Sequence, residues 1–224
     1  MPKLIIFDCD GTLVDSQHMI CEAMRTAFAA SGMAVPHRSH LVRHVGLSIA
    51  EAMMAMTGLE AGNAVAKLSA DYRAAFAALR KEARIADPMF PGASDAIGAL
   101  SSRDDILLGI ATGKSRRGVN GLLKREGLEG VFATIMTADD APSKPHPAMI
   151  ERAMDAVGAI PEDTVMIGDT TFDMLMARAA SVTAIGVGWG YHEARELSEA
   201  GASAVVEDFA SLLKLLLPDR AAAA

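Results

Sequence analysis

Residues 4–12 read Leu-Ile-Ile-Phe-Asp-Cys-Asp-Gly-Thr, so two aspartates one residue apart follow directly on a short apolar run. An apolar run of this length, bounded by polar residues, predicts a buried β-strand. Two carboxylates held at the end of such a strand repel each other, and a cation relieves that repulsion. Because Mg2+ prefers oxygen ligands, Asp8 and Asp10 predict a metal site and metal-assisted chemistry on a charged substrate.

Short apolar runs alternate with segments of helical periodicity through most of the chain. This alternation predicts right-handed β-α-β units and an α/β fold with a doubly wound parallel sheet. The expected strands are Lys3–Phe7, Ile106–Ala111, 132–136, 164–167, Thr183–Val187 and Ala204–Val206. The expected helices are Ala93–Ser101, 115–126, 146–157, 171–180, 192–200 and 208–217.

Residues 16–86 break this rhythm, because they contain no convincing strand and are rich in Ala and Met at helical spacings. We therefore predict an all-helical subdomain, residues 16–86, inserted after the first strand. The core domain would then consist of residues 1–15 and 87–224. The motif Phe90-Pro91-Gly92 predicts a hinge where the chain returns to the core.

Composition narrows the function classes. Hydrophobic residues make up 51% of the chain and charged residues 22%, which is enough apolar material for a substantial core. The net charge of −7 argues against a general nucleic-acid or anionic-membrane binder, since both need a basic face. Two cysteines, Cys9 and Cys21, predict reduced thiols in a cytoplasmic protein. We expect a monomer or homodimer whose partner is a small molecule.

Polar side chains follow four of the expected strands or the loops after them. Asp8 and Asp10 follow the first strand. The others lie in the motifs Thr112-Gly113-Lys114-Ser115, Pro142-Ser143-Lys144-Pro145 and Gly168-Asp169, the last of which precedes Asp173. Because ligands of open α/β sheets bind outside the carboxyl ends of the strands, we expect these groups to meet at one edge.

This constellation resembles the haloacid dehalogenase superfamily, specifically its phosphatase branch with a helical cap inserted after the first strand. The resemblance covers nearly the whole chain and implies a Rossmann-like core. Gly186-Val187-Gly188-Trp189-Gly190-Tyr191-His192 and Ala138-Asp139-Asp140 are similar to segments of phosphoglycolate-phosphatase-like members. The resemblance therefore implies a hydrolase of small phosphomonoesters, with phosphoglycolate and sugar phosphates as the leading substrate classes.

The family mechanism assigns roles to the acidic residues. Asp8 would attack phosphorus to give an aspartyl-phosphate, and Asp10 would protonate the leaving alkoxide and then activate water. Mg2+ would be held by the Asp8 carboxylate, the Asp10 main-chain carbonyl and Asp169. Asp173 would not bind the metal directly. It would either orient a metal-bound water or pair with Lys144.

Other residues would hold the substrate. Thr112, Gly113 and Lys144 would bind the phosphate group of the substrate. Gly113 departs from the family pattern, since many relatives carry Asn there, and leaves open how the loop after Thr112 is held. Arg43 and His44 are the cap residues that we expect to reach the substrate. The basic cluster of Lys114, Arg116 and Arg117 fits either an anion-attracting rim or a solvated helix start.

Four alternative functions are compatible with the same core fold, and each can be judged by the residues that it needs. A phosphosugar mutase of the β-phosphoglucomutase type shares all four motifs and stays open. A 2-haloacid dehalogenase lacks the second acid, which Asp10 supplies here. A phosphonatase needs a cap lysine soon after Asp15, whereas the cap offers only Lys67 and Lys81. A non-catalytic binding protein would be expected to lose the acidic residues that this chain keeps.

Overall fold

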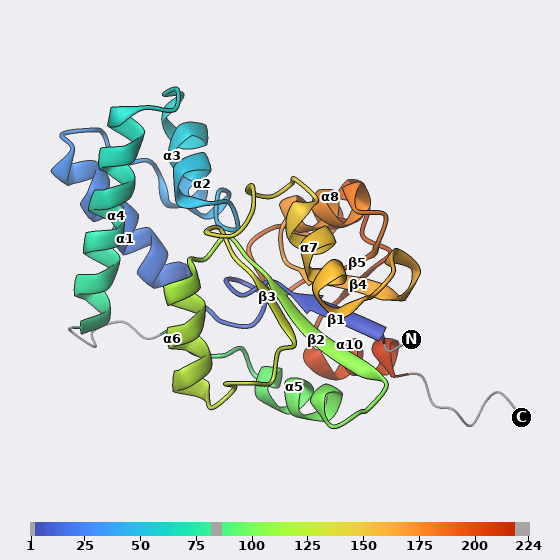
Figure 1. Ribbon diagram of the computed structural model, residues 1–224. Helices are drawn as coiled ribbons and strands as arrows, with labels where there is room; N and C mark the ends of the chain where they lie inside the picture. Colours follow the sequence, from blue (N-terminus) through green and yellow to red (C-terminus); the bar gives the residue numbers. More distant parts are fainter. Residues whose placement is uncertain (1–2, 82–86, 218–224) are drawn as a thin grey trace, which may run out of the picture.

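A six-stranded parallel sheet forms the centre of the molecule. The computed structural model describes residues 3–81 and 87–217. The sheet has the order β3-β2-β1-β4-β5-β6, and Figure 1 shows helices covering both of its faces. The strands are β1 (Lys3–Phe7), β2 (Ile106–Ala111), β3 (Thr134–Met136), β4 (Thr164–Gly168), β5 (Thr183–Val187) and β6 (Ala204–Val206). The predicted α/β fold with a doubly wound sheet is confirmed.

The side chains of β1 point alternately to the two faces of the sheet, so this one apolar run contributes to the core on both faces. Ile5 and Phe7 pack with the helices on one face, and Leu4 and Ile6 pack with those on the other. The first face carries α5 (Ala93–Ser101), α6 (Arg116–Glu126) and α10 (Phe209–Leu216). The second carries α7 (Ala148–Val157), α8 (Thr171–Ala179) and α9 (Ala194–Ala200). A strand buried on both sides reads as a continuous apolar run.

Three predicted starts, at residues 132, 146 and 192, were two residues early, and the last of these helices begins at Ala194. The third strand begins at Thr134 rather than at residue 132, because the side chain of Phe132 packs into the core before ladder pairing starts. The helix expected from residue 146 begins at Ala148. Pro145 and Pro147 cannot donate a main-chain hydrogen bond, and the His146 ring instead accepts one from the Ala148 N–H.

Four helices between β1 and β2 form a segment that we call the helical insert: α1 (Gln17–Ala30), α2 (Arg38–Val42), α3 (Ile49–Thr57) and α4 (Asn63–Lys81). They bury an apolar cluster of their own, centred on α1 and α4. In Figure 1 the insert stands beside the carboxyl ends of the strands. The division into two domains stays a prediction, and its boundary at residue 86 lies outside the described residues.

The two chain connections between core and insert run side by side. The Asp15 N–H donates to the Pro88 carbonyl, and the Phe90 N–H donates to the Leu13 carbonyl. A bridge also joins Val14 and Met89. The paired connections fix where the insert leaves and rejoins the core. No helix in the part of the chain that the structure describes could span a membrane.

Candidate active site

The acidic residues of the four motifs converge at the carboxyl edge of the sheet. Asp8 follows β1 and Asp169 follows β4, and these two strands are neighbours in the sheet. Asp173 lies in the first turn of α8. One carboxylate oxygen from each of these three residues lies within 4.8 Å of the other two. All three side chains are fully buried, so their charges are separated from water.

Lys144 supplies the positive charge at the centre of this cluster. Its Nζ lies 2.6 Å from Asp173 Oδ1 and 2.9 Å from Asp8 Oδ1. The lysine side chain is also buried, although it comes from the loop between β3 and α7. Burial alone would lower the pKa of Lys144, but attraction to Asp173 and Asp8 raises it above its ordinary value. The ammonium therefore stays charged.

One ammonium does not balance three carboxylates. Burial raises the pKa of Asp8 from 3.8 to about 6, although the attraction of Lys144 opposes that shift. Burial and repulsion from Asp173 and Asp8 raise the pKa of Asp169 well above its ordinary range. Both shifts report an excess of negative charge in a dry site. A bound cation would reverse them.

The three carboxylates of the acidic cluster differ in the hydrogen bonds that they accept. Asp173 accepts from Lys144 and from the Thr170 N–H and hydroxyl. Asp169 accepts from the Thr12 hydroxyl at 2.8 Å and from the Tyr191 N–H at 3.0 Å. Neither oxygen of Asp8 accepts a hydrogen bond from the described residues, despite the ion pair with Lys144. A buried carboxylate that is held by an ion pair rather than by hydrogen bonds, next to Asp169, fits a ligand of a divalent metal ion.

Gly11 makes room for this cluster. Its φ is +90°, and a Cβ at this position would lie 2.1 Å from Asp169 Oδ2. A side chain is thus excluded both by the left-handed backbone and by the carboxylate. The glycine after Asp10 is what lets the turn that follows β1 pass directly over the acidic cluster.

Asp10 is turned away from the acidic cluster, toward a cavity. Its Oδ1 accepts a hydrogen bond from the Ser16 hydroxyl at 2.5 Å and pairs with Lys114 Nζ at 2.5 Å. Sequence reasoning missed this role of Lys114, whose side chain is only 7% exposed. The position of Lys114 in the sequence could have suggested this role. It lies two residues after Thr112, just beyond β2, which is the strand beside β1.

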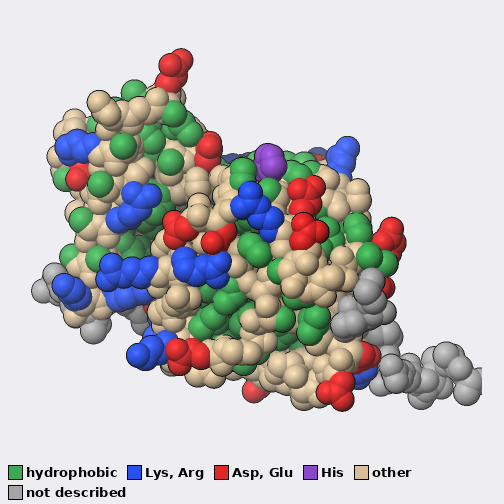
Figure 2. Space-filling view, viewed as in Figure 1, with side chains coloured by type: hydrophobic (Ala, Val, Ile, Leu, Met, Phe, Trp, Pro, Cys, Tyr) green, Lys and Arg blue, Asp and Glu red, His purple; other side chains and the backbone are tan. Residues whose placement is uncertain are grey.

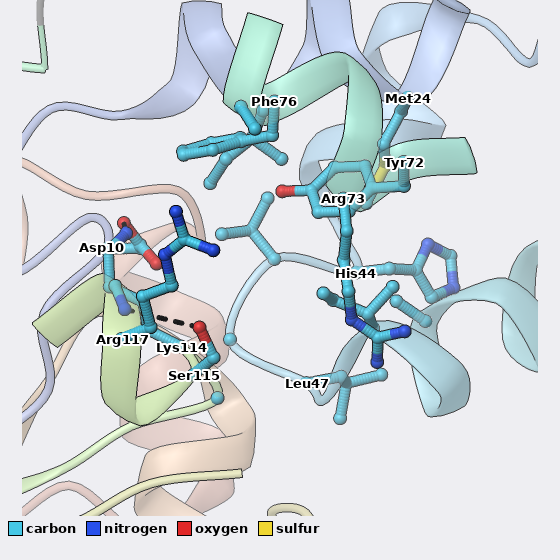
Figure 3. A pocket seen from close by; sticks show the side chains of 18 of the residues that line it. Asp10, Met24, His44, Leu47, Tyr72, Arg73, Phe76, Lys114, Ser115 and Arg117 are labelled. Atoms are coloured by element: carbon cyan, nitrogen blue, oxygen red, sulfur yellow. Dashed lines mark hydrogen bonds and ion pairs between the residues drawn. The ribbon is translucent and has the colours of Figure 1, made fainter. Parts of the chain in front are cut away.

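The cavity has a volume of about 360 Å³ and lies between the core and the helical insert. Asp10 lines it from the core, together with residues 113–115 and the start of α6. Figure 3 shows Tyr72 and Phe76 reaching into it from α4, with Arg117 opposite them. His44 lines the cavity from the loop before α3. The space in front of Asp10 is thus closed mainly by the insert.

Gly113 lies under the insert rather than beside an open loop. A Cβ there would be 2.4 Å from the Gly46 carbonyl oxygen and 2.5 Å from that of Leu47. The Ser48 N–H also donates to the Ser143 hydroxyl at 2.8 Å, which ties the same segment to the loop that carries Lys144. The absence of a side chain at Gly113 is therefore what allows the insert to approach this closely. Thr112 beside it is fully buried.

Arg43 is not brought to the cavity. Its guanidinium pairs with Glu196 of α9 at 2.7 Å, and its side chain is 60% exposed. The His192 ring lies 3.2 Å from the Arg43 carbonyl oxygen, which places this residue at a second contact between insert and core. Of the two insert residues expected to reach the substrate, only His44 lies at the cavity.

Comparison with known proteins gives the family. The model for haloacid dehalogenase-like hydrolases matches residues 5–187. The chain belongs to this family. It is 34% identical over 216 residues to "Probable phosphatase IndB" of Dickeya dadantii, with 95% of this chain and 93% of that protein covered. It is 33% identical over 218 residues to a phosphoglycolate phosphatase of Rhodospirillum rubrum, with 95% and 90% covered.

A solved structure agrees with these relatives. A hydrolase from Pseudomonas syringae superposes with a TM-score of 0.85 at 28% identity, covering 96% of this chain and 97% of that one. The predicted resemblance and the prediction of a phosphatase-type enzyme of this family are confirmed. The roles of individual site residues stay predictions.

Proposed function

We propose that the protein is a Mg2+-dependent phosphomonoesterase that transfers the phosphoryl group of its substrate first to Asp8 and then to water. The observation that carries this proposal is the buried Asp8 carboxylate, which has no hydrogen bond from the described residues. A carboxylate with a purely structural role would be expected to have its oxygens satisfied, as those of Asp173 are. Asp8 instead pairs with Lys144 through Oδ1, an arrangement in which the carboxylate can still bind a metal ion or attack phosphorus.

The first step needs Asp8 ionised and aimed at the phosphoryl group. Because its pKa is raised only to about 6, the carboxylate is mainly ionised at neutral pH. Lys144 lies against Asp8 and is held there by Asp173, so its ammonium can stabilise phosphoryl oxygens beside the nucleophile. Thr112, at the end of the neighbouring β2, adds a hydroxyl donor to this side.

Asp10 handles the protons on the other side of the phosphoryl group. It faces the cavity, where the leaving group would lie, whereas Asp8 lies in the closed cluster behind it. A protonated Asp10 would give its proton to the leaving oxygen as the bond to phosphorus breaks. The resulting carboxylate would then take a proton from the water that cleaves the aspartyl-phosphate.

Asp8 and Asp169 would hold Mg2+, together with the main-chain carbonyl of Asp10. When bound, the ion would neutralise charge on the phosphoryl oxygens and on the acidic cluster. Asp173 is occupied by Lys144 and Thr170, so its part is to position the lysine. The partner is a small phosphorylated metabolite in the cytoplasm, and phosphoglycolate or sugar phosphates are the classes that the sequence resemblance favours.

Hydrolysis of p-nitrophenyl phosphate by the purified protein, in Mg2+ and in excess chelator, tests this function. We expect turnover in Mg2+ and none in chelator. Asp8→Asn should lower kcat by a factor of at least about 10³ while circular dichroism shows the fold retained. Turnover that persists in chelator, or an Asp8→Asn variant with substantial activity, would contradict the proposal.

A further inference from the structure

We propose that the natural substrate is a phosphomonoester whose leaving group contains an aromatic ring and a second anionic group. This inference rests on the proposed phosphatase function and narrows its substrate class. The relevant feature is the cavity of about 360 Å³ in front of Asp10. Because Asp10 would protonate the leaving oxygen, whatever follows that oxygen in the substrate must occupy this cavity.

The size of the cavity does not suit a two-carbon acid. Pockets that enclose a drug-sized ligand have volumes of about 300–1,000 Å³, and this cavity lies within that range. A glycolate group would leave most of the space to water. The insert also approaches closely at Gly113, so the cavity is large even though insert and core are in contact.

The walls of the cavity are mainly apolar. Ile20 and Met24 line it from α1, and Tyr72 and Phe76 line it from α4. In Figure 3 the two aromatic side chains extend from α4 toward Arg117. The hydroxyls of a sugar ring need hydrogen-bonding partners, and the apolar side chains from α1 offer none. Aromatic and thioether side chains instead favour contact with a flat apolar ring.

Most of the charged side chains that line the cavity are positive. Among its described lining residues, Asp10 is the one carboxylate, and the cationic groups are Arg73, Arg80, Lys81, Lys114 and Arg117. Figure 2 shows Lys and Arg side chains gathered on the same side of the molecule, over α6 and the adjoining part of the insert. This local excess is opposite in sign to the net charge of the chain, which is −7. It would attract an anion beyond the transferred phosphoryl group.

Arg117 is the cation that faces the two aromatic side chains, and we assign the second anion to it. Lys114 is already paired with Asp10, and Arg80 is paired with Asp87 at 3.2 Å. No described residue forms a hydrogen bond or ion pair with the Arg117 guanidinium. In Figure 3 this guanidinium faces Tyr72 and Phe76 across the cavity. A ring lying against the aromatic side chains would bring its substituent near this arginine.

A matched series of alkyl esters separates leaving-group size from chemical reactivity. Ethyl phosphate, phosphoglycolate, benzyl phosphate and 4-carboxybenzyl phosphate all release an aliphatic alcohol, so their intrinsic reactivities are similar. We expect kcat/KM to be roughly tenfold or more higher for benzyl than for ethyl phosphate, because the ring buries apolar surface. The carboxybenzyl ester should have a still higher kcat/KM than benzyl phosphate, and Arg117→Gln should remove most of that difference.

Two variants on α4 provide a structural control. Ala77 and Ala78 are both exposed, but only Ala77 lines the cavity. Ala77→Trp should lower kcat/KM for benzyl phosphate by roughly tenfold more than it lowers kcat/KM for ethyl phosphate. Ala78→Trp should change neither value.

The outcomes distinguish this inference from the function on which it rests. Equal kcat/KM for ethyl and benzyl phosphate, a preference for phosphoglycolate, or equal effects of the two tryptophan variants would overturn the proposed substrate class while leaving the phosphatase intact. Failure to hydrolyse any of the four esters in Mg2+ would overturn both.

Discussion

The acidic cluster and the cavity lie on opposite sides of Asp10, yet they are built in different ways. In the cluster, Asp8, Asp169 and Asp173 are fully buried and held around one lysine. In the cavity, cationic and apolar side chains come from the helical insert and from the start of α6 with the residues before it. In the proposed mechanism, the closed, charged centre would carry the phosphoryl transfer, whereas the cavity wall formed by the insert would select the substrate.

Removing the charge of Lys144 should have the largest effect. Lys144→Met keeps the length of the side chain but leaves three buried carboxylates without their cation. We expect a loss of about 3–5 kcal/mol in the free energy of unfolding, because the surviving charges stay buried and unpaired. Urea unfolding in chelator measures this loss, and kcat in Mg2+ should fall by a factor of at least about 10³.

Lys124→Met is the matched control, since Lys124 is an exposed lysine on α6. It should change the free energy of unfolding by no more than about 0.5 kcal/mol. If Lys144→Met were as mild as this control, the acidic cluster would not depend on its lysine.

Adding a methyl group at Gly113 should have an intermediate effect. The Cβ of Gly113→Ala would meet the carbonyl oxygens of Gly46 and Leu47, so the insert must shift away from the core. We expect kcat/KM for p-nitrophenyl phosphate to fall roughly tenfold, with a loss of about 1–3 kcal/mol in stability from overpacking.

Gly98 on α5 provides the comparison, because a Cβ there meets no atom within 4 Å. Gly98→Ala should keep wild-type kinetics and gain about 0.5–1 kcal/mol in stability. Unchanged kinetics in Gly113→Ala would show that the close contact of insert and core does not matter for turnover.

Breaking the Arg43–Glu196 pair should have the smallest effect. The arginine is 60% exposed, so water screens the interaction. Arg43→Ala and Glu196→Gln should each change the free energy of unfolding by no more than about 0.5 kcal/mol and kcat/KM by less than about twofold. A tenfold rise in KM in Arg43→Ala alone would instead show that Arg43 contacts the substrate, as the sequence predicted.

The difference between the two regions explains which features of the fold and the site could be predicted from the sequence. Strands and the residues that follow them are local patterns, and a parallel sheet gathers its carboxyl ends at one edge, so the meeting of Asp8 and Asp169 was predictable. The pairing of Lys114 with Asp10 was not, because a lysine at a helix start fits a solvated position equally well. Arg43 shows the same limit, since its direction depends on Glu196, 153 residues away.

Gly113 illustrates a third kind of limit. From the sequence it was only a missing polar side chain. Its meaning depends on how closely the backbone of residues 46–47 packs against it, which is a property of the assembled molecule. Contacts between insert and core follow no periodic pattern, so the shape of the cavity required the structure.

Trapping the phosphoryl group on Asp8 would test the division of labour at Asp10 most directly. In Asp10→Asn, p-nitrophenyl phosphate can still react, because its leaving group needs no proton, but the second step lacks its base. Acid quenching in Mg2+ followed by peptide mass spectrometry should find the phosphoryl group on Asp8. The Asp8→Asn/Asp10→Asn double variant should carry none. A phosphoryl group on another residue, or none on Asp10→Asn while the wild type turns over, would contradict the mechanism.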